Sequence, residues 1–158
     1  MERDGQIDLL TELLSLSTMT LATTGAAGLP HAAPVYFVAQ PTSTTILPGE
    51  ALCFYFFSDP QSQHGQDLAL DQFAAAAIYP ECSGWHDIRG LQMRGRVLMV
   101  EDRMEWDNAW QAYLHKFPFA SGMKDIVALN RLYAFLPDWI RLVDNRQGFG
   151  FKQEWEFK

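Results

Sequence analysis

Ser58, Ser62 and His64 follow an aromatic, strand-like run and stand where a helix is expected to begin. The start of a helix leaves backbone N–H groups without partners and carries the positive end of the helix dipole, so it can bind an anion such as phosphate. Asp59 with Pro60 reads as one N-cap and first helical residue, and Ser62 is a second cap candidate one turn later. The alternative is an ordinary capped connection between a strand and a helix.

The run from His31 to Val38 is unusual for a strand, because Ala32, Ala33 and Pro34 place small side chains and a missing N–H in its middle. A flat ring can therefore approach this backbone closely. Proline also removes one hydrogen bond of the ladder, which leaves a neighbouring carbonyl or N–H for a ligand. The alternative is a bulged strand that binds nothing.

A later strand carries polar side chains that could supply charge to a ligand. Gln92 and Arg94 share one face by the two-residue period, in a run that also holds Arg89 and Arg96. One of the arginines could provide a cation to an anionic ligand. An exposed polar strand face is the alternative.

The elements that must position these residues follow from periodicity. Runs rich in Val, Ile, Thr and aromatic residues predict six strands, at 18–24, 30–39, 51–58, 73–80, 88–101 and 131–143. Helical spacing predicts an opening helix over Ile7–Leu16 and later helices at 104–116 and 124–129. The turn Gly25–Gly28 is expected to make a hairpin, and a Pro- and Thr-rich loop follows at 41–49. Six strands with few long helices favour a small barrel.

Composition limits the class of protein. The chain has 158 residues, 48% of them hydrophobic, which suits a single domain over residues 1–158. A net charge of -7 argues against a general binder of nucleic acid or of anionic membranes. Cys53 and Cys82 have no paired spacing, so we predict no disulfide framework and no metal site. Without a membrane-length apolar run or a basic leader, the protein is expected to be soluble and cytoplasmic.

Aromatic content predicts an assembly. A small barrel with this much aromatic surface is expected to bury part of it between two chains, as a homodimer. The acidic and aromatic tail at 148–158 either lies on the surface or crosses to the partner. The tryptophans are Trp85, Trp106, Trp110, Trp139 and Trp155.

The segment Leu21–Phe37 contains a strand, a glycine turn and a Gly-x-Pro-His strand, and an aromatic strand and a helix start follow. In this order, from residue 20 to about 95, the chain resembles the pyridoxamine 5′-phosphate oxidase-like, FMN-binding split-barrel family. A second match at Trp139–Asn145 is similar to a short uncharacterised bacterial subgroup of that family. The resemblance implies a mainly β fold: a six-stranded antiparallel split β-barrel of Greek-key topology with flanking α-helices. It also implies a homodimer that binds FMN at the subunit interface.

The resemblance assigns roles to residues of the first half. In the family, the strand after the glycine turn lines the isoalloxazine ring of FMN, which implies contacts from Ala33, Val35 and Tyr36. His64 stands where the family has a lysine that pairs with the FMN phosphate, and Gln63 stands where it has an arginine. A fixed cation makes strong charge-assisted bonds, whereas glutamine is neutral and histidine is mostly uncharged near neutral pH.

The second half completes the predicted site. The family has a flavin-contacting glutamine in the strand of Gln92, although its spacing to the following glycine differs here. A tryptophan and an arginine near Trp139 and Arg141 reach the partner subunit's flavin in the family; a core tryptophan with a surface arginine is the alternative. The predicted cofactor-binding residues are Ala33, Val35, Tyr36, Ser58, Ser62, Gln63, His64, Gln92, Trp139 and Arg141.

The sequence therefore predicts an FMN-binding flavoprotein, an oxidoreductase that acts on an unidentified small molecule. The cofactor would carry the chemistry, and the residues identify no catalytic acid or base. The alternative is a non-catalytic dimeric split-barrel protein that has lost FMN or binds another planar ligand such as haem.

Overall fold

The structure, a computed structural model, describes residues 2–41 and 52–157. Most of the loop expected at 41–49 lies outside these residues. The helices and strands are α1 (Glu2–Leu14), β1 (Thr18–Thr24), β2 (Pro30–Tyr36), β3 (Val38–Pro41), β4 (Leu52–Ser58), α2 (Gln63–Leu70), β5 (Phe73–Ile78), β6 (Arg89–Met99), α3 (Arg103–Lys116), α4 (Lys124–Leu129), β7 (Arg131–Asp144) and β8 (Lys152–Glu156).

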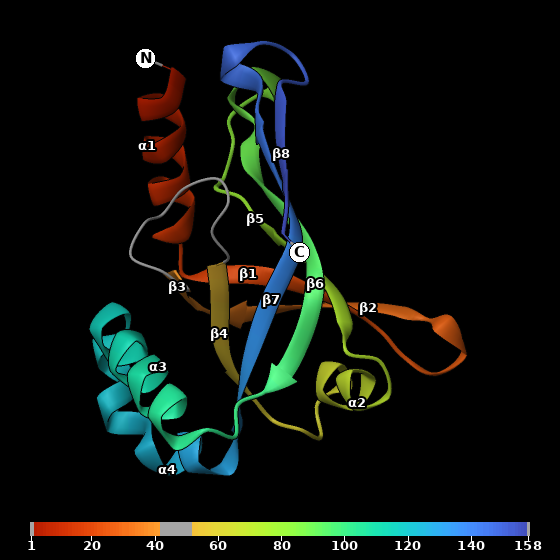
Figure 1. Ribbon diagram of the computed structural model, residues 1–158, viewed down its shortest axis with the longest axis vertical. Coiled ribbons are helices and arrows are strands. Elements are labelled where there is room, and N and C mark those ends of the chain that lie inside the picture. Colours follow the sequence, from red (N-terminus) through yellow and green to blue (C-terminus); the bar gives the residue numbers. More distant parts are fainter. Residues whose placement is uncertain (1, 42–51, 158) are drawn as a thin grey trace.

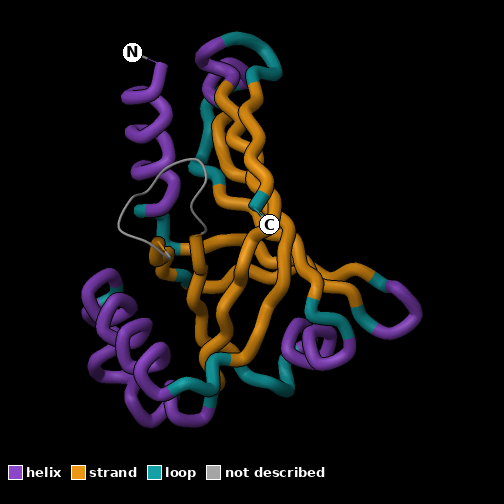
Figure 2. Tube along the Cα trace, viewed as in Figure 1, coloured by secondary structure: helices purple, strands orange, loops and turns teal. Residues whose placement is uncertain are grey.

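The strands form one curled antiparallel sheet. Its order is β2-β1-β5-β6-β7-β4-β3, and β8 pairs with β7 beside this path. Figure 1 shows the long β6–β7 ribbon crossing the sheet, and Figure 2 shows the helices at the periphery of the strands. The predicted fold class, a mainly β antiparallel barrel-like sheet with flanking helices, is confirmed.

The described residues form eight strands where the sequence predicted six. The run at 30–39 divides because β2 pairs with β1 whereas β3 pairs with β4, so the chain bends from one edge of the sheet toward the other. Phe37 and Val38, 0% and 6% exposed, are consecutive buried residues that break the alternation at this bend. The tail supplies the other extra strand, after a turn in which Gly150 has a positive φ of 75°.

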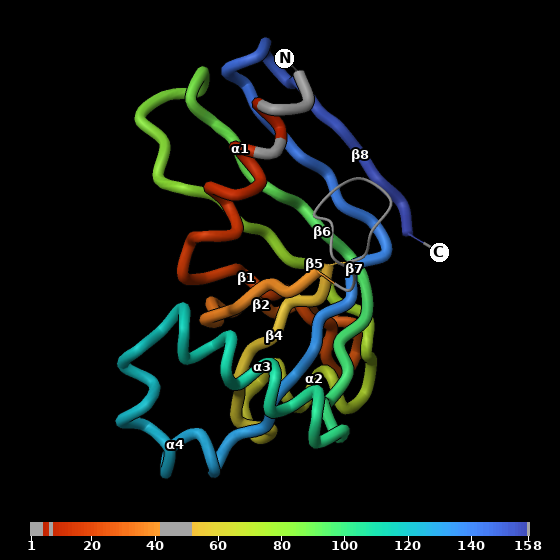
Figure 3. Tube along the Cα trace, turned by 60° about the vertical axis from the view of Figure 1, so that its left-hand side comes forward, coloured from red at the N-terminus to blue at the C-terminus, as the bar shows by residue number. Residues whose placement is uncertain are grey.

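Alternation of buried and exposed residues divides each strand between two faces. The inner face holds a core of large apolar side chains, onto which α1 packs Leu9 and Leu13. On the other side of β4, Tyr113 of α3 and Phe117, the residue after this helix, pack against Val38. Figure 3 shows α3 and α4 together at one end of the molecule, where β7 begins, and β8 toward the other end.

A bulge in β7 shapes the region that matters below. Arg94 pairs with Trp139 and Gly95 with Pro137, so Asp138 is the extra residue on β7. Pro137 has no N–H to give to the ladder, which suits a break in the pairing. Gly95 is required, because a Cβ there would lie 2.1 Å from the backbone oxygen of Leu136.

Two basic side chains connect the helices to neighbouring parts of the fold. Lys116 at the end of α3 donates to the carbonyl oxygens of Leu14, Leu16 and Phe37, at 3.0, 2.7 and 2.9 Å. Arg89 of β6 pairs with Glu12 of α1 at 2.6 Å.

Of the helices within residues 2–41 and 52–157, none is long and apolar enough to span a membrane.

Candidate functional site

The outer face of the sheet carries a floor of small side chains across β2, β1 and β5. Register aligns them in two rows, one of Ala32, Ala22 and Ala75 and the other of Pro34, Thr20 and Ala77. A shallow cavity of about 410 Å³ lies over part of this floor. Because no side chain in these rows is larger than threonine or proline, a planar ring can lie flat against the three strands.

Four larger side chains border the floor on β6 and β7: Gln92, Arg94, Trp139 and Arg141. The register continues the two rows, with Ala75 beside Arg94 and Ala77 beside Gln92. The guanidinium carbons of Arg94 and Arg141 lie 5.1 and 4.8 Å from the centroid of a Trp139 ring. Arg141 also donates to Gln92 Oε1 at 3.4 Å. The structure thus brings together Gln92, Trp139 and Arg141, three of the predicted residues.

The two arginines differ in how strongly carboxylates hold them. Arg141 pairs with Glu154 of β8 at 2.6 Å, and this hydrogen bond lowers the pKa of Glu154. Arg94 is 63% exposed, and the nearest oxygen of Asp138 is 3.8 Å from its Nε. Arg94 is therefore the cation more available to a ligand on the floor.

Tyr36 borders the opposite side of the floor, where its ring meets those of Phe117 and Phe119 edge-on at 5.3 and 5.9 Å. Ala33 and Val35 occupy the other face of β2, and Val35 is 7% exposed within the core. Of the three predicted ring contacts on β2, only Tyr36 therefore presents its side chain to the open face.

The start of α2 is capped by Ser62, the later of the two cap candidates. Ser62 Oγ accepts from the N–H of Gly65 at 3.2 Å and donates to the carbonyl of Asp59 at 2.6 Å. Asp59 Oδ1 accepts from the N–H of Gln61 in the preceding turn. The Ser62 hydroxyl is therefore engaged by the chain itself as both donor and acceptor.

Asp67, one turn into α2, is the centre of a buried polar network. This residue is 1% exposed, and its carboxylate accepts from Thr23 Oγ1, from Gln63 Nε2 and from the His31 ring, each at 2.8 Å. Burial favours the neutral acid, but the hydrogen bonds from Gln63, Thr23 and His31 outweigh it and lower the pKa of Asp67. A buried carboxylate is thus held in its charged form.

His64 is directed to Ser58, whose hydroxyl lies within hydrogen-bond contact of its Nε2. Burial lowers the pKa of His64, against the opposing effect of the Asp67 charge, so the imidazole is neutral near neutral pH. The structure therefore brings Ser58, Ser62, Gln63 and His64 together where β4 leads into α2, with their side chains hydrogen-bonded within the chain.

The sheet separates the two groups of predicted residues. Along β1, Thr23 faces α2 and Asp67, whereas Ala22 and Thr20 face the floor. One chain therefore presents a ring-sized floor on one face and the α2 start on the other.

Sequence reasoning missed the floor positions on β1 and β5, and it missed Asp67. The run Phe73–Ile78 holds four consecutive alanines, and this is the sequence signal that could have indicated the floor. Asp67 stands four residues after Gln63, the spacing of side-chain contacts on one helix face.

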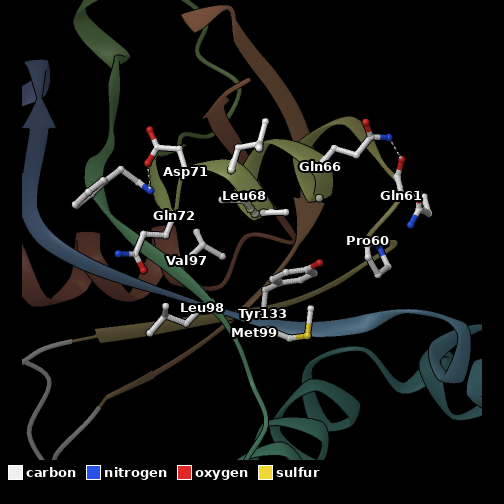
Figure 4. Close-up of a pocket in the computed structure, with 14 residues that line it drawn as sticks. Pro60, Gln61, Gln66, Leu68, Asp71, Gln72, Val97, Leu98, Met99 and Tyr133 are labelled. Carbon is white, nitrogen blue, oxygen red and sulfur yellow. Dashed lines mark hydrogen bonds between the residues drawn. The ribbon is translucent and has the colours of Figure 1, made fainter. Parts of the chain in front are cut away.

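A larger cavity of about 980 Å³ lies between α2 and the ends of β6 and β7. Figure 4 shows Leu68 on α2 above this cavity, with Val97 and Tyr133 on the strands below. None of the predicted cofactor-binding residues lines it.

Within the described residues, no group of three or more His, Cys, Asp or Glu side chains is placed to hold a metal ion.

Comparison with known families accounts for this architecture. Residues 8–134 match the family described as pyridoxamine 5'-phosphate oxidase. The chain belongs to this family. Among relatives of this oxidase-like chain, the UPF0306 protein YhbP of Salmonella paratyphi A is 32% identical over 104 residues, which cover 66% of this chain and 67% of the relative.

Solved structures share the fold of this oxidase-family chain. A heme binding protein from Mycobacterium smegmatis has a TM-score of 0.67 at 22% identity, covering 90% of this chain and 53% of that one. HutZ from Vibrio cholerae, described as a heme storage protein, has a TM-score of 0.63 at 15% identity, covering 85% of this chain and 88% of that one. At these identities the likeness concerns the fold alone.

Proposed function

We propose that this chain is a homodimeric flavin-binding protein, with FMN the form that its family implies, and that it acts as an oxidoreductase on a small molecule. The observation that carries the proposal is the open floor on β2, β1 and β5, bordered by Arg94, Trp139 and Arg141. Bound flavin would supply transfer of hydride or electrons, and the chain would supply orientation and exclusion of water.

The ring end of the site fits an isoalloxazine. Small side chains allow face-on contact with the backbone of the floor, and Trp139 at its border offers an aromatic edge or face for stacking. Arg94 and Arg141 place positive charge beside the ring, which favours negative charge on a reduced flavin. Gln92 adds an amide that can donate or accept at the ring edge.

A second copy is part of the proposal because one chain leaves the floor open to solvent. Exposed aromatic side chains stand around it, including Tyr36 at 49% and Phe73 at 57% exposure. A partner that covers this face would bury them and enclose the ring. The α2 start of one chain would then approach a flavin that lies on the floor of the other.

Filling the floor tests the proposal. Ala75→Leu adds a branched side chain at the centre of the floor, while Ala69→Leu adds the same side chain on the exposed face of α2. We expect wild type and Ala69→Leu to quench flavin fluorescence on titration and Ala75→Leu to lose at least about tenfold in affinity, since stacked contact requires close approach. Equal affinity in all three proteins would exclude the floor as the flavin site.

Haem is the second candidate, favoured by one feature of the α2 start. His64 replaces a cation of the family and is held neutral, the form in which an imidazole ligates iron. The named haem proteins above share the fold. Titration with hemin tests this: a Soret band that shifts in His64→Ala, but not in a variant of the exposed His115, would support haem, and unchanged spectra in both variants would exclude His64 as a ligand.

A further inference from the structure

Three hydrogen-bond donors converge on one buried carboxylate where the fold brings α2 against β1 and β2. Thr23 of β1, His31 of β2 and Gln63 of α2 all contact Asp67 at 2.8 Å. Asp67 is 1% exposed, so its charge is compensated by these three groups rather than by water. The donors of this corner are therefore satisfied by an anion that belongs to the chain.

Other polar side chains at the α2 start are also engaged within the chain. Ser62 is used as the helix cap, and Ser58 and His64 contact each other. The nearest strand cation by register is Arg131, opposite Ser58, and its guanidinium donates to the carbonyl of Asn130.

Electrostatics at this corner oppose a phosphate. A phosphate at the α2 start would approach the negative charges of Asp59 and Asp67. Like charges at short range disfavour each other, and Gln63 brings no positive charge to offset them.

We infer that Asp67 makes this chain indifferent to the flavin phosphate: the chain selects its ligand through the isoalloxazine ring, and FMN and riboflavin bind alike. The inference rests on the proposed flavin function and departs from the phosphate role that the family resemblance implies for Ser58, Ser62, Gln63 and His64. Asp67 is on this view a specificity-determining residue, since its charge opposes a phosphate and its carboxylate engages the side-chain donor of Gln63.

The first test compares the two flavins on the wild-type protein by fluorescence titration at physiological salt. We expect dissociation constants for FMN and riboflavin within about threefold of each other, because a phosphate that gains no charged hydrogen bond adds little affinity. A preference for FMN of about tenfold or more would overturn the inference. If Arg131→Gln abolished such a preference, the phosphate contact would belong to Arg131.

The second test asks whether Asp67 is the cause. Gln63→Arg restores the family's cation, but four residues before Asp67 it is expected to pair with that carboxylate and to leave FMN affinity unchanged. Gln66→Arg is the matched control, because it adds the same charge to α2 from a residue that contacts the carbonyl of Gln61 instead. Gln63→Arg combined with Asp67→Asn should tighten FMN by roughly tenfold and leave riboflavin unchanged.

The outcomes separate the inference from the flavin proposal. Equal tightening of FMN by Gln63→Arg alone and by the double variant would overturn the role of Asp67. If the variant that carries Asp67→Asn does not fold, the affinities for FMN and riboflavin can still be compared in wild type, Gln63→Arg and Gln66→Arg. All three proteins retain the carboxylate, so this comparison still tests whether the chain is indifferent to the phosphate.

Binding of neither flavin would refute the proposed function, and inorganic phosphate would then serve as the probe. We expect the backbone amide NMR signal of His64 to shift saturably with phosphate only in the double variant. A saturable shift in wild type, or none in the double variant, would overturn the inference.

Discussion

Lys116 is the residue whose replacement should reveal most about how the helices are held. Its ammonium donates to three carbonyl oxygens, of Leu14, Leu16 and Phe37, and lies 3.8 Å from the centroid of the Phe37 ring. These contacts join the end of α3 to the end of α1 and to the bend between β2 and β3. Lys116→Met keeps the apolar stem and removes all three hydrogen bonds.

The expected loss can be bounded from these contacts. A hydrogen bond from a charged donor contributes about 1.5–3 kcal/mol, but the carbonyls are partly reached by water once the ammonium is gone, and the effects are not additive. We expect Lys116→Met to lower the free energy of unfolding by about 3 kcal/mol near pH 7, which corresponds to a fall in Tm of about 6–12 °C for a chain of this size.

The pH dependence of this loss has a defined sign. Burial lowers the pKa of Lys116 from its ordinary value of 10.5 to about 8. Between these values the unfolded chain binds more protons than the folded one, so the stability of wild type relative to Lys116→Met should rise as the pH increases from about 8 toward 10.5. The full shift corresponds to about 3 kcal/mol, which solvent contact of this half-buried group reduces to about 1–2 kcal/mol.

Urea unfolding at several pH values between about 7 and 10 measures both quantities. Lys124→Met on the exposed face of α4 is the matched control, and it should change stability little at any pH. A loss in Lys116→Met no larger than in this control would refute the role of the three carbonyls. A wild-type advantage that shrinks as the pH rises would show instead that the carbonyls hold the ammonium charged.

Three further substitutions test other parts of the argument. Gly95→Ala should lower the free energy of unfolding by at least about 2 kcal/mol in urea, because its Cβ would lie 2.1 Å from the Leu136 oxygen. Trp139→Leu should weaken FMN and riboflavin equally, by roughly tenfold in fluorescence titration, whereas Trp85→Leu should weaken neither. Ala75→Arg should halve the mass measured by light scattering if the floor is the dimer interface; an unchanged dimer would place the interface elsewhere.

The sequence predicts those features that depend on near neighbours. Content of β-branched and aromatic residues located the strands from β1 to β7, although β2 and β3 were predicted as one strand. Apolar spacing located α3 and α4 within a residue or so of their observed ends. Ser62 was recognisable as a cap because its hydroxyl accepts a hydrogen bond from an N–H only three residues away. The tail strand β8 was missed because its residues are polar or charged apart from Trp155, without the β-branched content typical of strands.

Features that depend on register lie beyond such reasoning. Two separate strand pairings align Ala22, Ala32 and Ala75 in one row. The spacing of these residues in the sequence does not predict that alignment. Val35 is a further case: the family resemblance placed it beside the ring, whereas in the structure its side chain is buried in the core.

The α2 start shows why a local motif can mislead about chemistry. Ser62, Gln63 and His64 have the types and order of an anion site, and the helix does begin where they predict. Their side chains are nevertheless engaged within the chain: His64 contacts Ser58 of the preceding strand, Ser62 contacts Asp59 and Gly65, and Gln63 contacts Asp67. Thr23 and His31 of the sheet contact the same Asp67 carboxylate. Whether a helix start binds an external anion depends also on the charges near it, and at the α2 start the buried carboxylate of Asp67 adds a negative charge that opposes a phosphate.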